Sequence, residues 1–122
     1  MENLTLFAIT FVGLLHVGFL ILEMFLWDTP KGHKVFRLDP AFAKQSKTLA
    51  ANQGLYNGFL AAGLFYSIFL SANPADRFNW ATFFLTCVLI AGLYGWKTVS
   101  KTILYVQALP ALATLILTYM YL

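Results

Sequence analysis

Charged residues are scarce in this sequence. Only 11% of its 122 residues are Asp, Glu, Lys or Arg, against about a quarter in an average soluble domain. The deficit accompanies a hydrophobic share of 60%, and a chain of this length forms too small a core to bury so much apolar surface. The composition therefore excludes an ordinary soluble domain and predicts a protein whose apolar side chains are covered by a lipid bilayer.

Other absences exclude several familiar chemistries. The single cysteine, Cys87, lies within an apolar segment, so the chain has no disulfide framework. Histidines, cysteine and carboxylates are not spaced as zinc ligands, and neither a metal nor a cofactor is expected. No glycine-rich phosphate loop is present, and no serine stands beside a histidine. The N-terminus has neither a basic region nor a cleavage site, so we expect the first apolar segment to remain in the mature protein.

Four apolar segments are present, each close to the roughly 20 residues that a helix needs to cross a membrane. They cover residues 4–26, 48–72, 79–96 and 102–122. Asp39 and Pro40 form a favourable N-cap and first-turn pair, so the second helix is expected to begin before its apolar segment. Short connections predict an all-α membrane protein, a single domain built as an antiparallel bundle of four transmembrane helices.

The cations predict the orientation of this bundle. Loops 28–47 and 97–101 contain seven of the eight Lys and Arg residues, and only Arg77 lies between the second and third segments. The positive-inside rule places both basic loops in the cytoplasm and both termini on the other side. We therefore expect a multi-pass protein of a bacterial inner membrane or plasma membrane.

Membrane orientation also accounts for the net charge of +3, so no nucleic-acid partner is expected. Membrane lipids are the expected partners, and association with further copies of the chain is left open. Three cations of the first loop are candidates for binding anionic headgroups: Lys31, Lys34 and Arg37.

Ionisable side chains inside a transmembrane segment are costly and mark candidate functional sites. The first segment contains two, His16 and Glu23, and the helical period places them on one face. The same period groups four polar residues of the second segment on one face: Asn52, Gln53, Tyr56 and Asn57. Nearly opposite lie Gly54, Gly58 and Ala61. Gly54 and Gly58 form a small-xxx-small pattern, which predicts close packing of another helix.

Several of these polar groups are expected to lie at a similar depth in the membrane. In the expected orientation one polar group of each helix lies near its cytoplasmic end: Glu23, Asn52 with Gln53, Tyr94 and Gln107. His16 and Asn57 lie deeper. The pattern predicts a cytoplasm-facing polar pocket with Glu23 and His16 as candidate catalytic residues. The candidate ligand-binding residues are Asn52, Gln53, Tyr56, Asn57, Tyr94 and Gln107.

Three functions fit this pattern. In the first, the pocket binds or converts a small amphipathic or lipid-like molecule, and the pattern does not decide whether the protein is an enzyme. In the second, a proton-coupled small-molecule transporter acts as a dimer and uses Glu23 as its membrane carboxylate. In the third, a non-catalytic scaffold or partner subunit associates through the small-residue face, and Glu23 and the amides only hold the bundle together.

Several runs carry a family resemblance: EMFLW at 23–27, TP at 29–30, KVF at 34–36 and AANQGLYNGFLAAG at 50–63. Through them nearly the whole chain resembles the small bacterial and fungal membrane proteins of the domain-of-unknown-function family thirteen hundred and four. The resemblance implies a four-helix integral membrane protein and no particular reaction. Its motif residues include Glu23, Asn52, Gln53 and Asn57.

Overall fold

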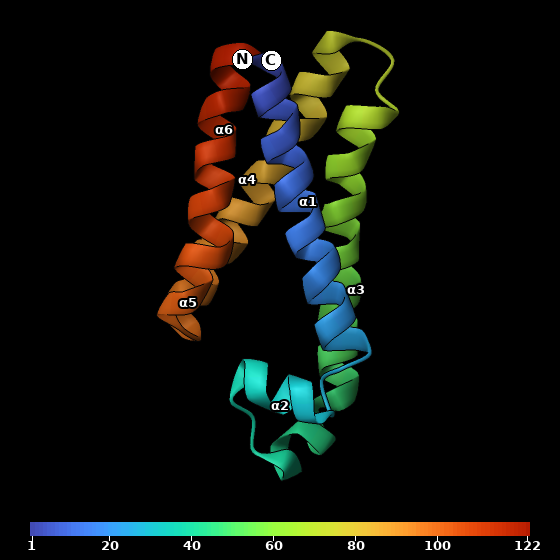
Figure 1. The fold of residues 1–122 in the computed structure, drawn as a ribbon, viewed down its shortest axis with the longest axis vertical. Coiled ribbons are helices and arrows are strands. Elements are labelled where there is room, and N and C mark those ends of the chain that lie inside the picture. The colour runs from blue at the N-terminus through green and yellow to red at the C-terminus, as the bar shows by residue number, and fades with distance from the viewer. The chain divides into compact units, whose positions relative to one another are not determined.

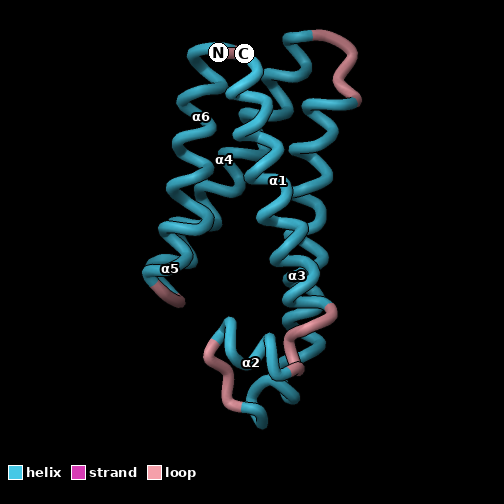
Figure 2. Tube along the Cα trace, viewed as in Figure 1, coloured by secondary structure: helices cyan, strands magenta, loops and turns pink.

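The structure is a computed structural model that describes residues 1–122. It consists of helices and connecting loops and has no strand (Figures 1 and 2). The elements are α1 (Glu2–Met24), α2 (Pro30–Phe36), α3 (Pro40–Phe69), α4 (Pro74–Thr98), α5 (Lys101–Ile103), the π-helix η1 (Leu104–Ala108) and α6 (Leu109–Tyr121). The expected all-helical class is confirmed.

Three helical stretches are long and apolar enough to cross a membrane: Glu2–Met24, Pro74–Thr98 and Lys101–Tyr121. This finding is consistent with a membrane protein. The longest helix, α3, with 30 residues, is not among the three. Asn52, Gln53 and Asn57 lower the hydropathy of its apolar part. Length and composition therefore support three of the four expected spans.

Three of the helices begin with a capping residue followed by a proline. Asp39 Oδ2 accepts hydrogen bonds of 3.1 and 3.2 Å from two backbone N–H groups in the first turn of α3. The helix begins at Pro40, as the sequence predicted. The other two pairs are Thr29–Pro30 before α2 and Asn73–Pro74 before α4. Proline fits the first helical position because the N–H that it lacks would have no partner within the helix.

The last apolar stretch changes its hydrogen-bond pattern in front of Pro110. Proline has no N–H to bond the carbonyl four residues back, so the carbonyl of Val106 cannot receive its usual helical bond. In the structure η1 lies directly before α6, and the N–H of Leu109 bonds the carbonyl of Leu104, five residues back. The wider turn of the π-helix η1 therefore lies directly before Pro110, which has no N–H to donate.

The chain divides into two compact units. Unit 1 comprises Met1–Gly13 and Ala62–Leu122, and unit 2 comprises Leu14–Ala61. In unit 1 the two chain termini lie side by side (Figure 1). Thr5 Oγ1 donates a hydrogen bond of 3.4 Å to the carbonyl of Leu117 near these termini.

Helix α4 connects several parts of unit 1. It packs against η1 and α6, and their backbones are close at Gly92, where an added Cβ would lie 2.7 Å from the backbone nitrogen of Ala108. At its other end, Arg77 Nη1 donates to Glu2 Oε1 at 3.2 Å. The ring of Phe78 meets that of Tyr119 edge to face, with centroids 5.2 Å apart.

The interior of unit 1 contains polar side chains while its exterior is apolar. Four hydroxyl residues are buried, and each hydroxyl bonds a backbone carbonyl: Thr5, Ser67, Thr114 and Thr118. Large exposed side chains of the same unit include Phe7, Phe83, Ile90 and Ile116. Exposed apolar surface of this kind is unfavourable in water, whereas lipid accepts it and requires that polar groups be bonded inside.

Candidate functional site

Glu23 and Asn57 meet between α1 and α3 in unit 2. Asn57 Nδ2 donates a hydrogen bond of 2.8 Å to Glu23 Oε1. Asn57 is buried, whereas Glu23, in the last turn of α1, is partly exposed. The bond joins one carboxylate oxygen of Glu23 to the amide nitrogen of Asn57. Glu23 Oε2 and the Asn57 side-chain carbonyl take no part in this bond, and both are hydrogen-bond acceptors.

Small residues on α3 bring these two side chains together. A Cβ added at Gly54 would lie 2.7 Å from Met24 Cγ, and one added at Gly58 would lie 2.5 Å from Leu20 Cδ1. The small-residue face therefore lies against α1 within the same chain. From Ala50 onward, the buried positions of α3 in unit 2 alternate in steps of four and three residues: Ala50, Gly54, Asn57 and Ala61. This spacing is typical of a helix that packs along its partner at a shallow crossing angle.

The structure separates Asn57 from the polar residues with which the sequence had grouped it. Asn52 is exposed and donates to the carbonyl of Thr48 on its own helix at 3.0 Å. Gln53 is exposed, and Tyr56 is 57% exposed with its ring beside that of Phe59. Position 57 lies only about 60° around the helix from position 54, so it shares the side of α3 that faces α1. The predicted polar face thus contributes one residue to this contact.

His16 lies on α1, seven residues before Glu23, which is about 10 Å along a helix axis. It is fully buried. Its ring meets that of Phe19 edge to face, with centroids 5.3 Å apart and planes at 82°. The imidazole and the carboxylate therefore form two separate polar positions along α1.

The other two candidate ligand-binding residues belong to unit 1. Tyr94, near the end of α4, is 72% exposed. Gln107 is half-buried and lies in η1. Of the residues predicted to form a pocket, the structure thus joins Glu23 and Asn57 by a direct bond within unit 2.

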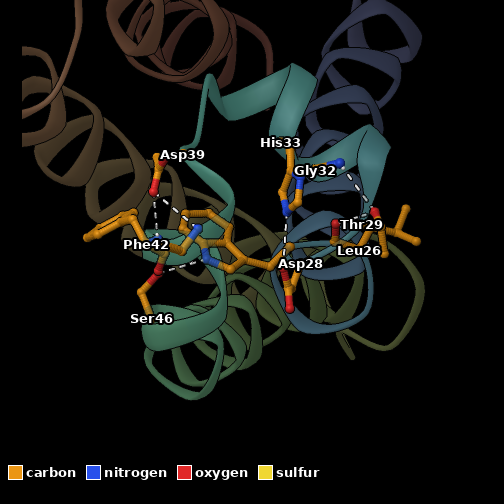
Figure 3. Close-up of polar contacts among 10 residues, drawn as sticks. Leu26, Asp28, Thr29, Gly32, His33, Asp39, Phe42 and Ser46 are labelled. Carbon is orange, nitrogen blue, oxygen red and sulfur yellow. Dashed lines mark hydrogen bonds and ion pairs between the residues drawn. The ribbon is translucent and has the colours of Figure 1, made fainter.

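A folded elbow, residues 25–47, comprises the connection between α1 and α3, with α2 in it, and the first eight residues of α3 (Figure 3). The indole nitrogen of Trp27 donates to Ser46 Oγ at 3.0 Å, and its ring lies against that of Phe36, with centroids 4.8 Å apart. His33 Nε2 and Asp28 Oδ1 are also 3.0 Å apart. These contacts fold the loop back on itself.

Sequence reasoning treated this segment as a basic loop and did not predict α2. The Thr29–Pro30 pair was the available signal, since the Thr29 hydroxyl accepts a bond from the N–H of Gly32 at 3.3 Å. Gly32 is buried, and a Cβ there would overlap the carbonyl oxygens of Leu26 and Trp27. The three headgroup candidates, Lys31, Lys34 and Arg37, are exposed and form no ion pair.

The fold defines an all-helical protein with three helices able to cross a membrane. The family described as "Protein of unknown function (DUF1304)" matches residues 10–119, so the chain belongs to this family. The chain is also 30% identical over 121 residues to "Uncharacterized protein YpaA" of Lactococcus lactis subsp. lactis (strain IL1403), with 98% of this chain and 99% of that protein covered. No solved structure matches.

These comparisons correct the description that accompanied the sequence resemblance. The matching family is described only as a protein of unknown function, without a four-helix architecture or a fungal distribution. The relative named above is bacterial and uncharacterised. The comparisons therefore establish membership of a family of unknown function and do not give the number of membrane spans.

Proposed function

We propose that this is a four-span membrane protein in which Glu23 and Asn57 bind the polar group of a small amphipathic or lipid-like molecule. The hydrogen bond of 2.8 Å between Asn57 Nδ2 and Glu23 Oε1 carries the proposal. It fixes the carboxylate while leaving acceptor oxygens on both side chains. A headgroup with an amine or hydroxyl donor fits these acceptors, and Glu23 serves as its counter-ion or proton acceptor.

Helix α3 supplies the fourth span in this proposal, although its overall hydropathy is low. Its buried asparagine, Asn57, faces α1, so it would be shielded from lipid. Large exposed side chains on the same helix are apolar or aromatic: Leu55, Phe59, Tyr66 and Phe69. A helix with this distribution can lie in a bilayer beside a partner, because its exposed amides, Asn52 and Gln53, lie near the cytoplasmic end of the span, and the deeper Asn57 faces the partner helix. The proposed spans are 4–26, 48–72, 79–96 and 102–122, within a single transmembrane domain.

The proposed orientation places both termini outside the cytoplasm and can be tested by labelling. In a Cys87→Ser background, we expect a membrane-impermeant maleimide to label Ala75→Cys on intact cells, because the first turn of α4 lies on the outer side in this topology. Ser100→Cys, in the connection after α4, should be labelled only after the membrane is opened. Both native residues are exposed, so neither position is protected by packing. Labelling of Ser100→Cys alone on intact cells would show the opposite orientation.

Glu23→Gln tests the proposed binding site. Glutamine keeps the size of the side chain and an oxygen that can accept the bond from Asn57, but it removes the charge. Hydrogen bonds to charged groups contribute about 1.5–3 kcal/mol, so the affinity for dodecylamine should fall about tenfold or more. Titration calorimetry of the full-length protein in a non-ionic detergent would measure this affinity.

Glu2→Gln is the matched control, because Glu2 is a carboxylate on the same helix and lies in unit 1. It should bind dodecylamine as the parent protein does. Thermal unfolding of both variants establishes that they are folded. Equal affinity of the parent protein and Glu23→Gln would refute the proposed role of Glu23.

Two alternatives use the same residues differently. A scaffold that associates through Gly54, Gly58 and Ala61 is disfavoured, because this face of α3 already lies against α1 in the same chain. A proton-coupled transporter acting as a dimer would also require Glu23. A Glu23-dependent proton flux in liposomes would favour the transporter, whereas binding without flux would favour the proposed binding protein or an enzyme.

A further inference from the structure

The elbow of residues 25–47 combines a compact fold with an excess of positive charge. It contains five lysines and arginines and two carboxylates. Asp28 is held by His33 at 3.0 Å, and Asp39 accepts backbone bonds at the start of α3. Neither carboxylate forms an ion pair with a lysine or arginine of the elbow. The positive charge is therefore not neutralised within the elbow.

All five cations are exposed: Lys31, Lys34, Arg37, Lys44 and Lys47. On α2, Lys31 and Lys34 lie three residues apart and so share one side of the helix. The buried Gly32 and the half-buried Phe36 turn toward the rest of the elbow. Arg37 adopts a left-handed conformation, with φ 53°, at the point where the chain leaves α2. This turn returns the chain toward α3, so the cations of both helices belong to one short folded segment.

Apolar side chains are exposed beside these cations. Val35 is 49% exposed, next to Lys34, and Phe42 is 55% exposed, two residues before Lys44. Trp27 ties the start of the elbow to α3 through its hydrogen bond to Ser46. A soluble anion would match the charges but not the apolar side chains. The surface of an anionic bilayer matches both, because it offers phosphate groups above hydrocarbon.

We infer that the elbow of residues 25–47 binds the headgroups of anionic phospholipids on the cytoplasmic face of the membrane. The cations contact lipid phosphates, while Val35 and Phe42 enter the region just below them. The inference rests on the membrane placement proposed above but not on the roles of Glu23 and Asn57. It predicts that anionic lipid is enriched around the elbow relative to a neutral lipid of the same bilayer.

Fluorescence quenching of Trp27 tests this enrichment. With Trp80→Phe and Trp96→Phe, Trp27 is the only tryptophan of the full-length protein. The protein is placed in nanodiscs of equal parts phosphatidylglycerol and phosphatidylcholine, and one of the two lipids is brominated. We expect brominated phosphatidylglycerol to quench about threefold more than brominated phosphatidylcholine at low salt, and the preference to weaken as salt is added.

Charge variants identify the groups responsible. Removing the five cations as Lys→Gln at positions 31, 34, 44 and 47 and Arg37→Asn should bring the quenching ratio to about one, because each charge contributes to lipid attraction. Asparagine tolerates the left-handed backbone at position 37, so the turn is preserved. If this variant does not fold, Lys31→Gln with Lys34→Gln should lower the ratio in part. Lys97→Gln with Lys101→Gln is the matched control outside the elbow and should leave the ratio unchanged.

The other possible results of these experiments either overturn the inference or identify a different ligand. A ratio of one in the parent protein overturns the inference and leaves an acidic protein partner to be sought. A threefold ratio that persists in the charge variants also overturns it. Loss of the preference in millimolar inorganic phosphate at constant ionic strength would instead identify a soluble-anion site. Glu23→Gln should keep the threefold ratio, so failure of the binding-site proposal is distinguishable from failure of this one.

Discussion

Gly92→Ala is expected to lower the free energy of unfolding by about 2–3 kcal/mol, as overpacking of a close interior contact does. An added Cβ would lie 2.7 Å from the backbone nitrogen of Ala108 and 2.9 Å from its Cα. Backbone atoms cannot rotate away as the end of a side chain can, so α4 and η1 would have to move apart. Thermal or chemical unfolding of the purified protein in a mild detergent would measure the loss.

Two other glycines provide matched controls for this substitution. Gly18 has no neighbour within 4 Å of an added Cβ, so Gly18→Ala should stabilise the protein by up to about 1 kcal/mol through helix propensity. At Gly58 the nearest atom is Leu20 Cδ1, the end of a flexible side chain. Gly58→Ala should therefore have a small effect. If Gly92→Ala unfolds at the same temperature as Gly58→Ala, the contact between α4 and η1 is not as close as described.

Gly32→Ala is expected to open the elbow at a cost of about 1–3 kcal/mol. The new methyl group would overlap the carbonyl oxygens of Leu26 and Trp27, which belong to the backbone on the other side of the turn. Because α2 is short, with seven residues, it should shift as a whole rather than adjust one side chain. The bond between Trp27 and Ser46 should then be lost.

Trp27 fluorescence distinguishes this local opening from general unfolding. In the protein with Trp27 as its only tryptophan, Gly32→Ala should change the emission maximum of Trp27 in the folded state. In a companion protein that retains only Trp80, which lies in unit 1, the emission should not change. An unaltered Trp27 spectrum together with unaltered stability would contradict the close approach of Gly32 to the backbone.

Local sequence signals predicted much of the secondary structure. Apolar segments predicted the long helices, and Asp39 with Pro40 predicted where α3 begins. These signals act over a few residues, so they can be read without knowing the fold. The π-helix was not predicted, because Pro110 shows that one bond is lost but not how the preceding residues rearrange.

The arrangement of side chains between helices was harder to predict. Helical periodicity placed Asn57 with Asn52 and Gln53, yet α3 turns Asn57 toward Glu23. The direction that a helix presents to its partner depends on which small residues allow close approach, here Gly54 and Gly58. The short amphipathic helix α2 was also not predicted. Its contacts are made with residues before and after it in the elbow, and these become neighbours only when the chain folds.

The bond between Asn57 and Glu23 also bears on how the protein enters the membrane. In the proposed topology α3 is the one span that its length and composition alone do not indicate, and the amide of Asn57 gains its side-chain partner only when α1 lies alongside. A ribosome completes α1 before it makes α3, so the carboxylate is already in position when the amide emerges. The two helices would then partition into lipid as a hairpin, and the order of the segments along the chain would assist biogenesis.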